Sequence, residues 1–321
     1  MTASTAASAA APVVSQIGHP LLGVTAGWEL LGRGPTTVVR VELARGRVTT
    51  TAVPAILSSG PSSFVVGRDW AMVRPLDRVP GYVVRDGRAA QPLYGPLESI
   101  GPAMPGPDGN SVWVPAAGRD TSMILVDAGG RPTGPSVSLP PGVLATVTSD
   151  DAGYLVFVGN GGAYSVRPDG PRRITTGQLV AAGPTRWLAL ECDDRYRCGA
   201  VIIDRRTGAR RAVDVPLEQA AVSAGTISPD GATAALIESG PNGSIIAALY
   251  SLASNSSRAI GAPVGTSFDL ATMVWSPDSR WLFVAGADGS LYPVDAATGT
   301  VHSLGVTLPP ITQLAVRPAP A

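Results

Sequence analysis

Two cysteines are the residues whose type and spacing most clearly suggest chemistry. Cys192 and Cys198 flank the sequence DDRYR, and the apolar runs on either side predict a β-hairpin. Cysteines across a tight hairpin favour a disulfide, which for so short a loop stabilises by about 2 kcal/mol. The alternatives are two reduced thiols, or a metal or redox role, although structural zinc needs about four ligands and no histidine is near. If the disulfide forms, we expect an oxidising and therefore extracytoplasmic setting, with the cytoplasm as the alternative.

Other catalytic groups are scarce. The chain has 2 histidines, and all 24 of its basic residues are arginine, so lysine chemistry is excluded. A Ser-His-Asp triad would need His19, in a loose N-terminal segment, or His302, in an outermost strand. The paired acids Asp150–Asp151 and Asp193–Asp194 fall in predicted turns, where solvated aspartate is ordinary and calcium is the alternative. We therefore predict no catalytic residue, no metal and no cofactor, while carboxylates could still perform acid–base chemistry.

Composition narrows the class of protein further. The formal net charge is +0, which argues against a nucleic-acid partner. No stretch approaches the 18 apolar residues that a membrane span requires. With Gly 38 and Pro 30 among 321 residues, turns are frequent, which favours many short strands over helices.

The elements that would position these residues are clearest between Thr272 and Val306. Four apolar runs, ATMVW, WLFVA, LYPV and VHSLGV, are separated by SPDS, ADGS and AATGT, which predicts a four-stranded antiparallel meander. An aromatic residue recurs near the start of the second strand of each such unit, at Trp28, Trp70, Trp113, Tyr154, Trp187 and Trp281. A period of about 40 to 50 residues with four strands is typical of a β-propeller.

The sequence therefore predicts an all-β fold, a seven-bladed β-propeller of four-stranded antiparallel blades. Only three strands precede Pro54 in the first unit, and one strand, ITQLAVRP (Ile311 to Pro318), remains after the seventh. We expect it to pair with Trp28 to Gly32, so that the C-terminal strand closes the ring in blade one. Closure of this kind removes exposed sheet edges.

The turn motifs resemble those of a known family. SPDGATAALI (Ser228 to Ile237) and SPDSRWLFV (Ser276 to Val284), with the later DRRTG and DAATG turns, are similar to the S-P-D-G repeats of TolB-type, WD-repeat-like propellers. The first two blades hardly match this motif. The resemblance implies a propeller, and it transfers no catalytic residue, because binding proteins and enzymes share the motif.

We expect two regions along the chain. Residues 1–22 are small, uncharged and without period, and lack the features of a signal peptide, which predicts a disordered lead or a stalk. Residues 23–321 are expected to form a single propeller domain. Any membrane tether would then come from a segment outside this sequence.

One face of the ring is the predicted binding surface. Loops between the second and third strands of each blade share a face, and the predicted strands place six residues in these loops, namely Arg33, Arg78, Arg119, Arg195, Tyr196 and Arg197. The opposite face would collect aspartates that make turns: Asp86, Asp108, Asp150, Asp151, Asp169, Asp230 and Asp278. We expect a non-catalytic binding or scaffold propeller whose arginine face meets a protein or a small anionic ligand. The alternative is a hydrolase or lyase with Asp, Arg and Tyr at the channel mouth, or an asymmetry with no function beyond making turns.

Overall fold

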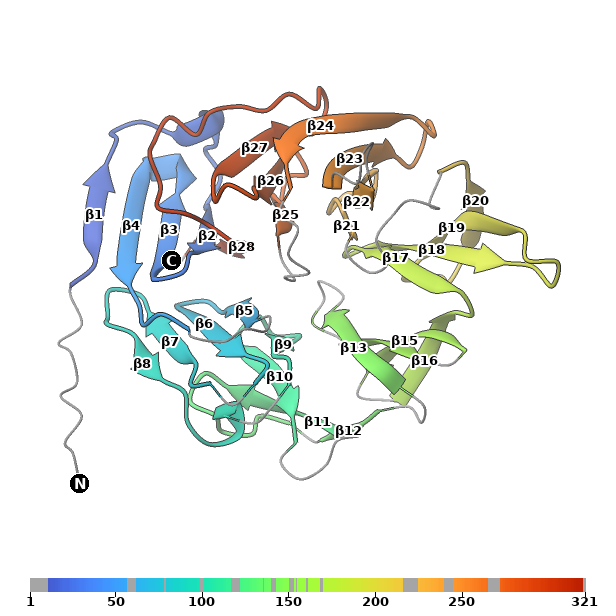
Figure 1. Cartoon of the computed structure of the whole chain (residues 1–321), viewed down its shortest axis with the longest axis horizontal. Helices are drawn as coiled ribbons and strands as arrows, with labels where there is room; N and C mark the ends of the chain where they lie inside the picture. The colour runs from blue at the N-terminus through green and yellow to red at the C-terminus, as the bar shows by residue number, and fades with distance from the viewer. Residues whose placement is uncertain are drawn as a thin grey trace.

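The computed structural model is built from β-sheets arranged in a ring around a common axis, the propeller arrangement (Figure 1). It describes residues 11–56, 62–77, 79–98, 101–116, 122–134, 136–139, 143–149, 153, 155–159, 161–167, 170–215, 225–239, 245–264 and 272–319. Within these ranges, three short 3-10 helices lie between strands: η1(Leu21–Gly23), η2(Leu43–Arg45) and η3(Gly95–Glu98). No helix in the described part of the chain is long and apolar enough to cross a membrane.

Three sheets have the expected four strands. The first contains β5(Ser62–Val66), β6(Trp70–Pro75), β7(Tyr82–Arg85) and β8(Gln91–Pro92). The second contains β9(Met104–Pro105), β10(Ser111–Pro115), β11(Ser122–Asp127) and β12(Val137–Ser138). The third contains β13(Val143–Ser149), β14(Leu155–Gly159), β15(Gly162–Arg167) and β16(Gly170–Thr175).

Eight strands form one larger sheet made of two antiparallel meanders. The first meander is β17(Gln178–Ala182), β18(Arg186–Cys192), β19(Cys198–Asp204) and β20(Arg210–Val213). The second is β21(Gly225–Ile227), β22(Thr233–Ser239), β23(Ile245–Ser251) and β24(Ser257–Pro263). They are joined where β17 and β21, the first strand of each meander, pair in parallel over two residue pairs.

The sheet that joins the chain ends, here called the first blade, confirms the expected closing strand. β28(Gln313–Pro318) pairs antiparallel with β2(Trp28–Arg33), from Trp28↔Pro318 to Arg33↔Gln313. β3(Thr37–Glu42) and β4(Arg47–Ala52) follow outward, and β1(Val13–Gln16) adds a fifth strand on β4. Within residues 1–22, the predicted lead or stalk, Val13–Gln16 pair with β4 and the side chain of Leu21 is buried.

The sheet nearest the C-terminus before β28, here called the last blade, is smaller than expected. It consists of β25(Met273–Trp275), β26(Trp281–Ala285) and β27(Leu291–Asp295). The run VHSLGV, expected as its fourth strand, contributes only the isolated bridge Val294↔Val301 before the chain turns away. Gly305 has a φ of 77°, and Pro309 and Pro310 cannot donate backbone hydrogen bonds, so the segment is poorly suited to continue a strand.

The S-P-D motifs form the same side-chain network in two places. Ser276 donates its hydroxyl to Asp278 Oδ1 and accepts the N–H of Trp281 at 2.9 Å. Ser228 donates to Asp230 Oδ1 in the same way and accepts the N–H of Thr233 at 3.0 Å. The motif thus holds the turn that precedes the second strand of each meander, because the serine and aspartate side chains satisfy the backbone donors of the turn.

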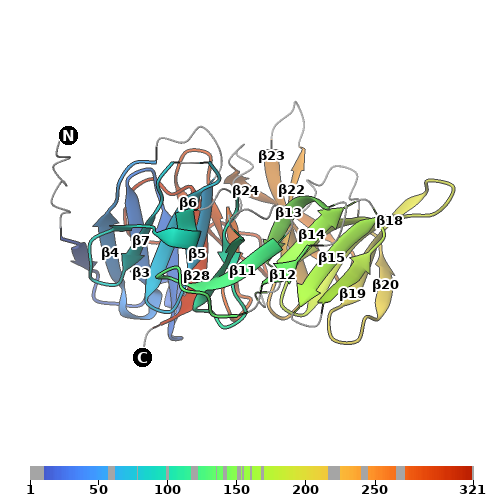
Figure 2. The same cartoon turned by 90° about the horizontal axis from the view of Figure 1, so that it is seen from below.

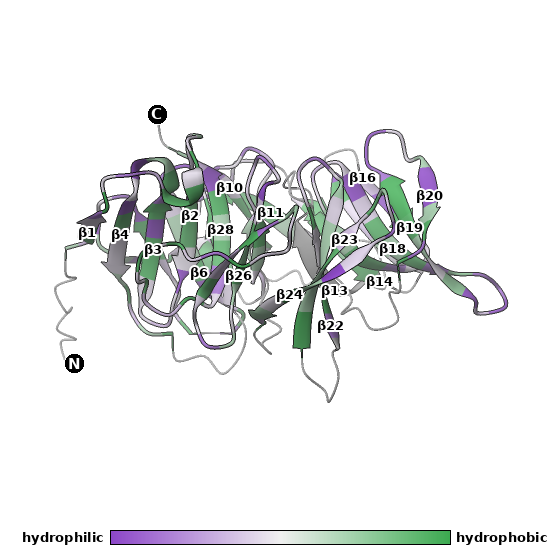
Figure 3. Cartoon of the chain, turned by 90° about the horizontal axis from the view of Figure 1, so that it is seen from above, coloured by the Kyte–Doolittle hydropathy of each residue, from purple (hydrophilic) through white to green (hydrophobic). Residues whose placement is uncertain are grey.

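The core lies between neighbouring sheets. Seven hydrophobic clusters are present in the described residues, and each joins side chains of two meanders that are consecutive around the ring. The repeated tryptophans belong to these clusters, and the indoles of Trp70 and Trp113 also donate across to the following sheet, to Asn110 at 3.0 Å and Gly153 at 2.8 Å. They are therefore packing residues, as their one-per-repeat spacing predicts, while Tyr154 lies outside the described residues. Figure 3 shows hydrophobic residues in many of the strands.

Candidate functional site

The β18–β19 hairpin extends beyond the body of the ring, as both views show (Figures 1 and 2). Its strands pair over seven residues, and the pair at the tip is Cys192↔Cys198. These two cysteines are joined by a disulfide, with Cα atoms 3.9 Å apart. The expected disulfide is therefore confirmed, and it ties the two strands together immediately below the exposed turn.

Asp193 organises the five residues inside the disulfide loop. Its carboxylate accepts the backbone N–H of Arg195 at 2.9 Å and of Arg197 at 3.0 Å. The guanidinium of Arg197 donates to the same carboxylate, with an ion-pair distance of 2.7 Å. The backbone N–H and the guanidinium of Arg197 hold the pKa of Asp193 below its ordinary value. The Asp193 carboxylate consequently stays ionised at neutral pH and closes the turn.

Tyr196 is the residue that this turn presents to solvent. Its φ is 58°, in the left-handed region that a tyrosine rarely adopts, and its side chain is 90 % exposed. Two backbone hydrogen bonds close the turn: Asp193 N–H donates to Arg197 O at 3.0 Å, and Tyr196 N–H donates to Asp193 O at 3.0 Å. The backbone of an exposed aromatic residue is thus fixed by the turn.

The structure brings only part of the predicted arginine set together. Arg195, Tyr196 and Arg197 share the hairpin tip, whereas Arg33 ends β2 in the first blade, across the ring (Figure 1). Arg78 and Arg119 lie outside the described residues. Three of the residues predicted to bind a partner therefore lie together, and we call Arg195, Tyr196 and Arg197 the β18–β19 tip.

Arg33 is engaged inside the protein. It is half-buried and donates to the amide oxygen of Gln313 on β28, whose own amide nitrogen donates to Ser62 O at 2.8 Å. Arg33 also lies beside the phenol of Tyr82; burial raises the pKa of Tyr82 to about 12, and the arginine partly opposes that rise. These contacts connect the first blade with the sheet β5–β8, which is a structural role.

The aspartates predicted on the opposite face make turns or ion pairs. Asp108, Asp230 and Asp278 each accept backbone N–H groups of their own turn. Asp86 instead joins an ionic group with Arg40 and Arg317. Asp150, Asp151 and Asp169 lie outside the described residues. For the described members, turn formation and ion pairing account for the aspartates without a ligand.

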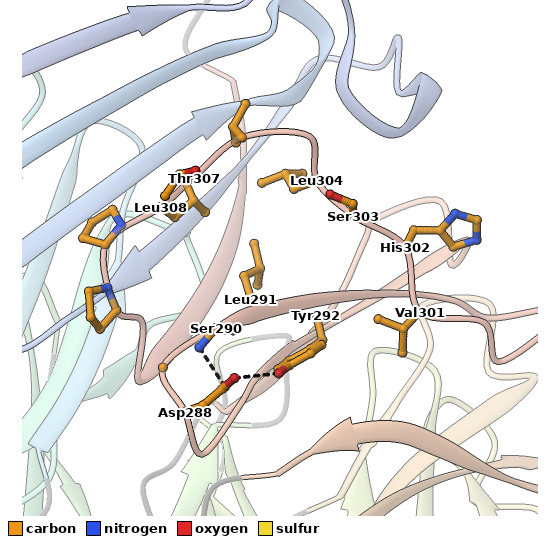
Figure 4. Close-up of a pocket in the computed structure, with 14 residues that line it drawn as sticks. Asp288, Ser290, Leu291, Tyr292, Val301, His302, Ser303, Leu304, Thr307 and Leu308 are labelled. Carbon is orange, nitrogen blue, oxygen red and sulfur yellow. Dashed lines mark hydrogen bonds between the residues drawn. The ribbon is translucent and has the colours of Figure 1, made fainter.

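A second candidate site, which the sequence did not predict, is a pocket of about 520 Å³ beside β27 (Figure 4). It is lined by residues 288–292, 301–304 and 306–310. On one wall the Asp288 carboxylate accepts the N–H of Ser290 at 3.0 Å and the hydroxyl of Tyr292 at 2.7 Å. These two donors lower the pKa of Asp288, and the same contact raises the pKa of Tyr292. The glycine and the two prolines of 305–310 were the features that could have indicated a gap here.

The segment opposite β27 is anchored at both ends of this pocket. The backbone N–H of His302 donates to Pro293 O at 2.8 Å, and that of Ile311 donates to Gly289 O at 2.7 Å. The imidazole of His302 packs edge-on against Trp281, with ring centroids 5.2 Å apart. His302 is thereby directed away from Asp288 (Figure 4), so the pocket does not assemble a His–Asp pair.

Comparisons with known proteins bear on the fold. No protein-family model matches the chain, and no curated protein sequence matches it. Among solved structures, it is similar to a prolyl endopeptidase at 13% identity and a TM-score of 0.57, covering 91% of this chain and 49% of that one. It is also similar to a putative 6-phosphogluconolactonase from Bacteroides fragilis at 11% identity and a TM-score of 0.50, covering 93% and 99%. TolB from Acinetobacter baumannii matches at 14% identity and a TM-score of 0.49, covering 85% and 78%. At such identities the likeness is one of fold, a β-propeller.

Proposed function

We propose that this chain is a non-catalytic binding propeller that acts outside the cytoplasm and contacts a partner protein through the β18–β19 tip. The observation that carries the proposal is the exposure of Tyr196 at the end of a disulfide-tied hairpin that extends from the ring. Tyrosine and arginine are the residues most often found at the energetic centre of protein interfaces.

The tip is suited to an acidic surface on the partner. Arg195 and Arg197 flank Tyr196 in the sequence, on a turn whose backbone the disulfide and Asp193 already order, so little backbone conformational entropy remains to be lost on binding. Arg197 forms an ion pair with Asp193, whereas the guanidinium of Arg195 has no ion-pair partner within the described residues. A carboxylate of the partner could accept a charge-assisted hydrogen bond from it.

We also propose that the ring has seven blades. On this count the eight-stranded sheet is two blades, and the sheet β25–β27 is one. The seven clusters between consecutive meanders support the count, because a closed ring of seven blades has seven such contacts.

The binding proposal is tested with Tyr196→Ala and Arg195→Ala. Biotinylated protein is incubated with the extracytoplasmic fraction of its native cell, and retained proteins are quantified by mass spectrometry at low and high salt. We expect a retained protein whose amount falls at least about tenfold with Tyr196→Ala and falls with salt in the wild type. Tyr94→Ala is the matched control, since Tyr94 is 64 % exposed but lies off the tip.

Equal retention by the wild type and by both tip variants would overturn the proposal. The location is tested separately by alkylating protein freshly taken from its native cell without reductant. An intact mass with no alkylated thiol is expected for an oxidising compartment. Two alkylated thiols would contradict the extracytoplasmic assignment.

A further inference from the structure

The outer edge of β27 has backbone hydrogen-bonding groups that are available to another strand. Pro293 O and Asp295 N already point outward, since they bond His302 N at 2.8 Å and Thr300 O at 2.9 Å. Alternate residues of a strand direct their backbone groups to the same side, so the N–H and C=O of Leu291 also point outward, toward the pocket. Within the described residues, neither group has a hydrogen-bond partner.

The walls of the pocket match an apolar chain with one positive charge. Across from β27 the lining includes the apolar residues Leu304, Val306, Leu308, Pro309 and Pro310, interspersed with Ser303 and Thr307. Asp288 is the single ionised side chain in the lining, and its hydrogen bonds to Ser290 and Tyr292 keep it ionised. A largely half-buried wall with apolar residues, beside an unpaired strand edge and one carboxylate, therefore suits an extended segment with an apolar residue and a basic side chain.

We propose that this pocket binds an extended peptide segment of a partner protein, as the strand that the last blade lacks. The segment pairs its backbone with Leu291, places an apolar side chain against Leu304 and Leu308, and places a lysine or arginine on Asp288. The volume of about 520 Å³ falls in the usual range of roughly 300–1,000 Å³ for ligand pockets. This site is separate from the β18–β19 tip, and either can fail without the other.

Charge decides against a second copy of this chain as the occupant. The exposed strand β1 is the extended apolar segment that another copy could offer, with Val13 at 66 % and Val14 at 50 % exposure. Its sequence, VVSQ, contains no basic residue to meet Asp288. A segment from a different protein, with a basic residue next to its apolar residues, complements the pocket better.

The test uses a phage-displayed random dodecapeptide library selected on the full chain, with counter-selection on Leu291→Pro. Proline removes the N–H at 291, and Pro293 already occupies the same outward register of β27. Enriched peptides are made with a fluorescein label, and their Kd is measured by fluorescence anisotropy. We expect alternating apolar residues with a lysine or arginine, and binding weakened at least about tenfold by Leu291→Pro and by Asp288→Asn.

Asp278→Asn is the matched control, because Asp278 caps another turn of the same blade. Should Leu291→Pro not fold, Asp288→Arg replaces it, and peptides with glutamate in place of the basic residue should then bind this variant better than the wild type. The proposal is overturned if no enriched peptide distinguishes the wild type from these variants, or if enriched peptides lack a basic residue. A dimer in sedimentation analysis that Leu291→Pro abolishes would also overturn it, because a second copy would then be the occupant.

Discussion

The first and last blades are neighbours that share one hydrophobic cluster, yet they complete their sheets in opposite ways. Trp28 and Phe283, one from each blade, pack with ring centroids 5.9 Å apart. The first blade receives a strand from each end of the chain and has five. The last blade keeps three and leaves a pocket where a fourth would lie.

The difference is also electrostatic. The first blade buries an ionic group in which Arg317 of β28 meets Glu29 of β2 at 2.9 Å and Asp86 at 2.7 Å, while Arg40 meets Glu29 at 2.7 Å. Arg317 also donates to Gly67 O at 3.1 Å. The last blade holds the segment between Thr300 and Ile311 with three backbone hydrogen bonds and one aromatic contact. One edge is therefore closed by paired charges that are largely buried, and the other is left available.

Removal of the closing strand should have the largest effect. Deletion of Ile311 to Ala321 leaves the edge of β2 unpaired and removes the buried side chains of Ile311 and Leu314. It also leaves Glu29 without its ion-pair partner Arg317. We expect loss of the folded, soluble protein, measured by circular dichroism and size-exclusion chromatography. Deletion of residues 320–321 alone is the control and should leave both unchanged, because it keeps β28 and the hydrogen bond from Ala319 N to Gly27 O. A full deletion variant with an unaltered melting temperature would contradict the importance of closure.

Loss of the closing arginine alone should be the next largest effect. Arg317→Met leaves Glu29 buried with one partner fewer and should lower the free energy of unfolding by about 3–5 kcal/mol. The corresponding change in the last blade, Arg280→Met, removes an exposed guanidinium above the Trp281 ring and should cost less than about 1 kcal/mol. Urea unfolding measures both. Equal losses from the two variants would show that the two edges are not held differently.

The anchoring of segment 301–310 is tested with the two histidines of the chain. His302→Ala removes the edge-on contact with Trp281 and should lower the free energy of unfolding by about 0.5–1.5 kcal/mol. His19→Ala, next to the first blade, removes an exposed ring and should leave stability unchanged within about 0.5 kcal/mol. Thermal unfolding monitored by tryptophan fluorescence is suitable, because Trp281 itself reports the change. A stronger effect of His19→Ala would reverse the comparison.

The smallest effect is expected at the outermost strand of the first blade. Replacing Val13 and Val14 by serine changes exposed side chains on β1 and should alter the free energy of unfolding by less than about 0.5 kcal/mol. Chemical denaturation gives the value, and Val39→Ser in β3, where the side chain is fully buried, serves as the contrasting variant. A large loss from the β1 variant would mean that this strand carries part of the closure.

Much of the fold could be predicted because the sequence patterns that specify it are local. The S-P-D turns, the alternating apolar runs and the tryptophan at each repeat lie within short windows, and the structure confirms β26, β22 and the packing role of Trp70 and Trp113. The hairpin tip belongs to the same class, since Cys192 and Cys198 are 6 residues apart. The pocket beside β27 was missed because VHSLGV has the composition of a strand, and composition does not reveal whether a neighbour is in register.

The sequence by itself determined where most strands and turns occur, that the two cysteines are placed to pair, and that the last strand belongs with the first unit. Tertiary structure decided how each sheet ends. Arg33 and Gln313 are 280 residues apart, and Glu29 and Arg317 are 288 apart, so no local pattern could show that these polar groups satisfy one another. Val13–Gln16 join a sheet while 302–310 leave one, although both segments are short and largely uncharged. The physical reason is that a strand's propensity is local, whereas its partner is chosen by which edge remains unpaired once the ring has closed.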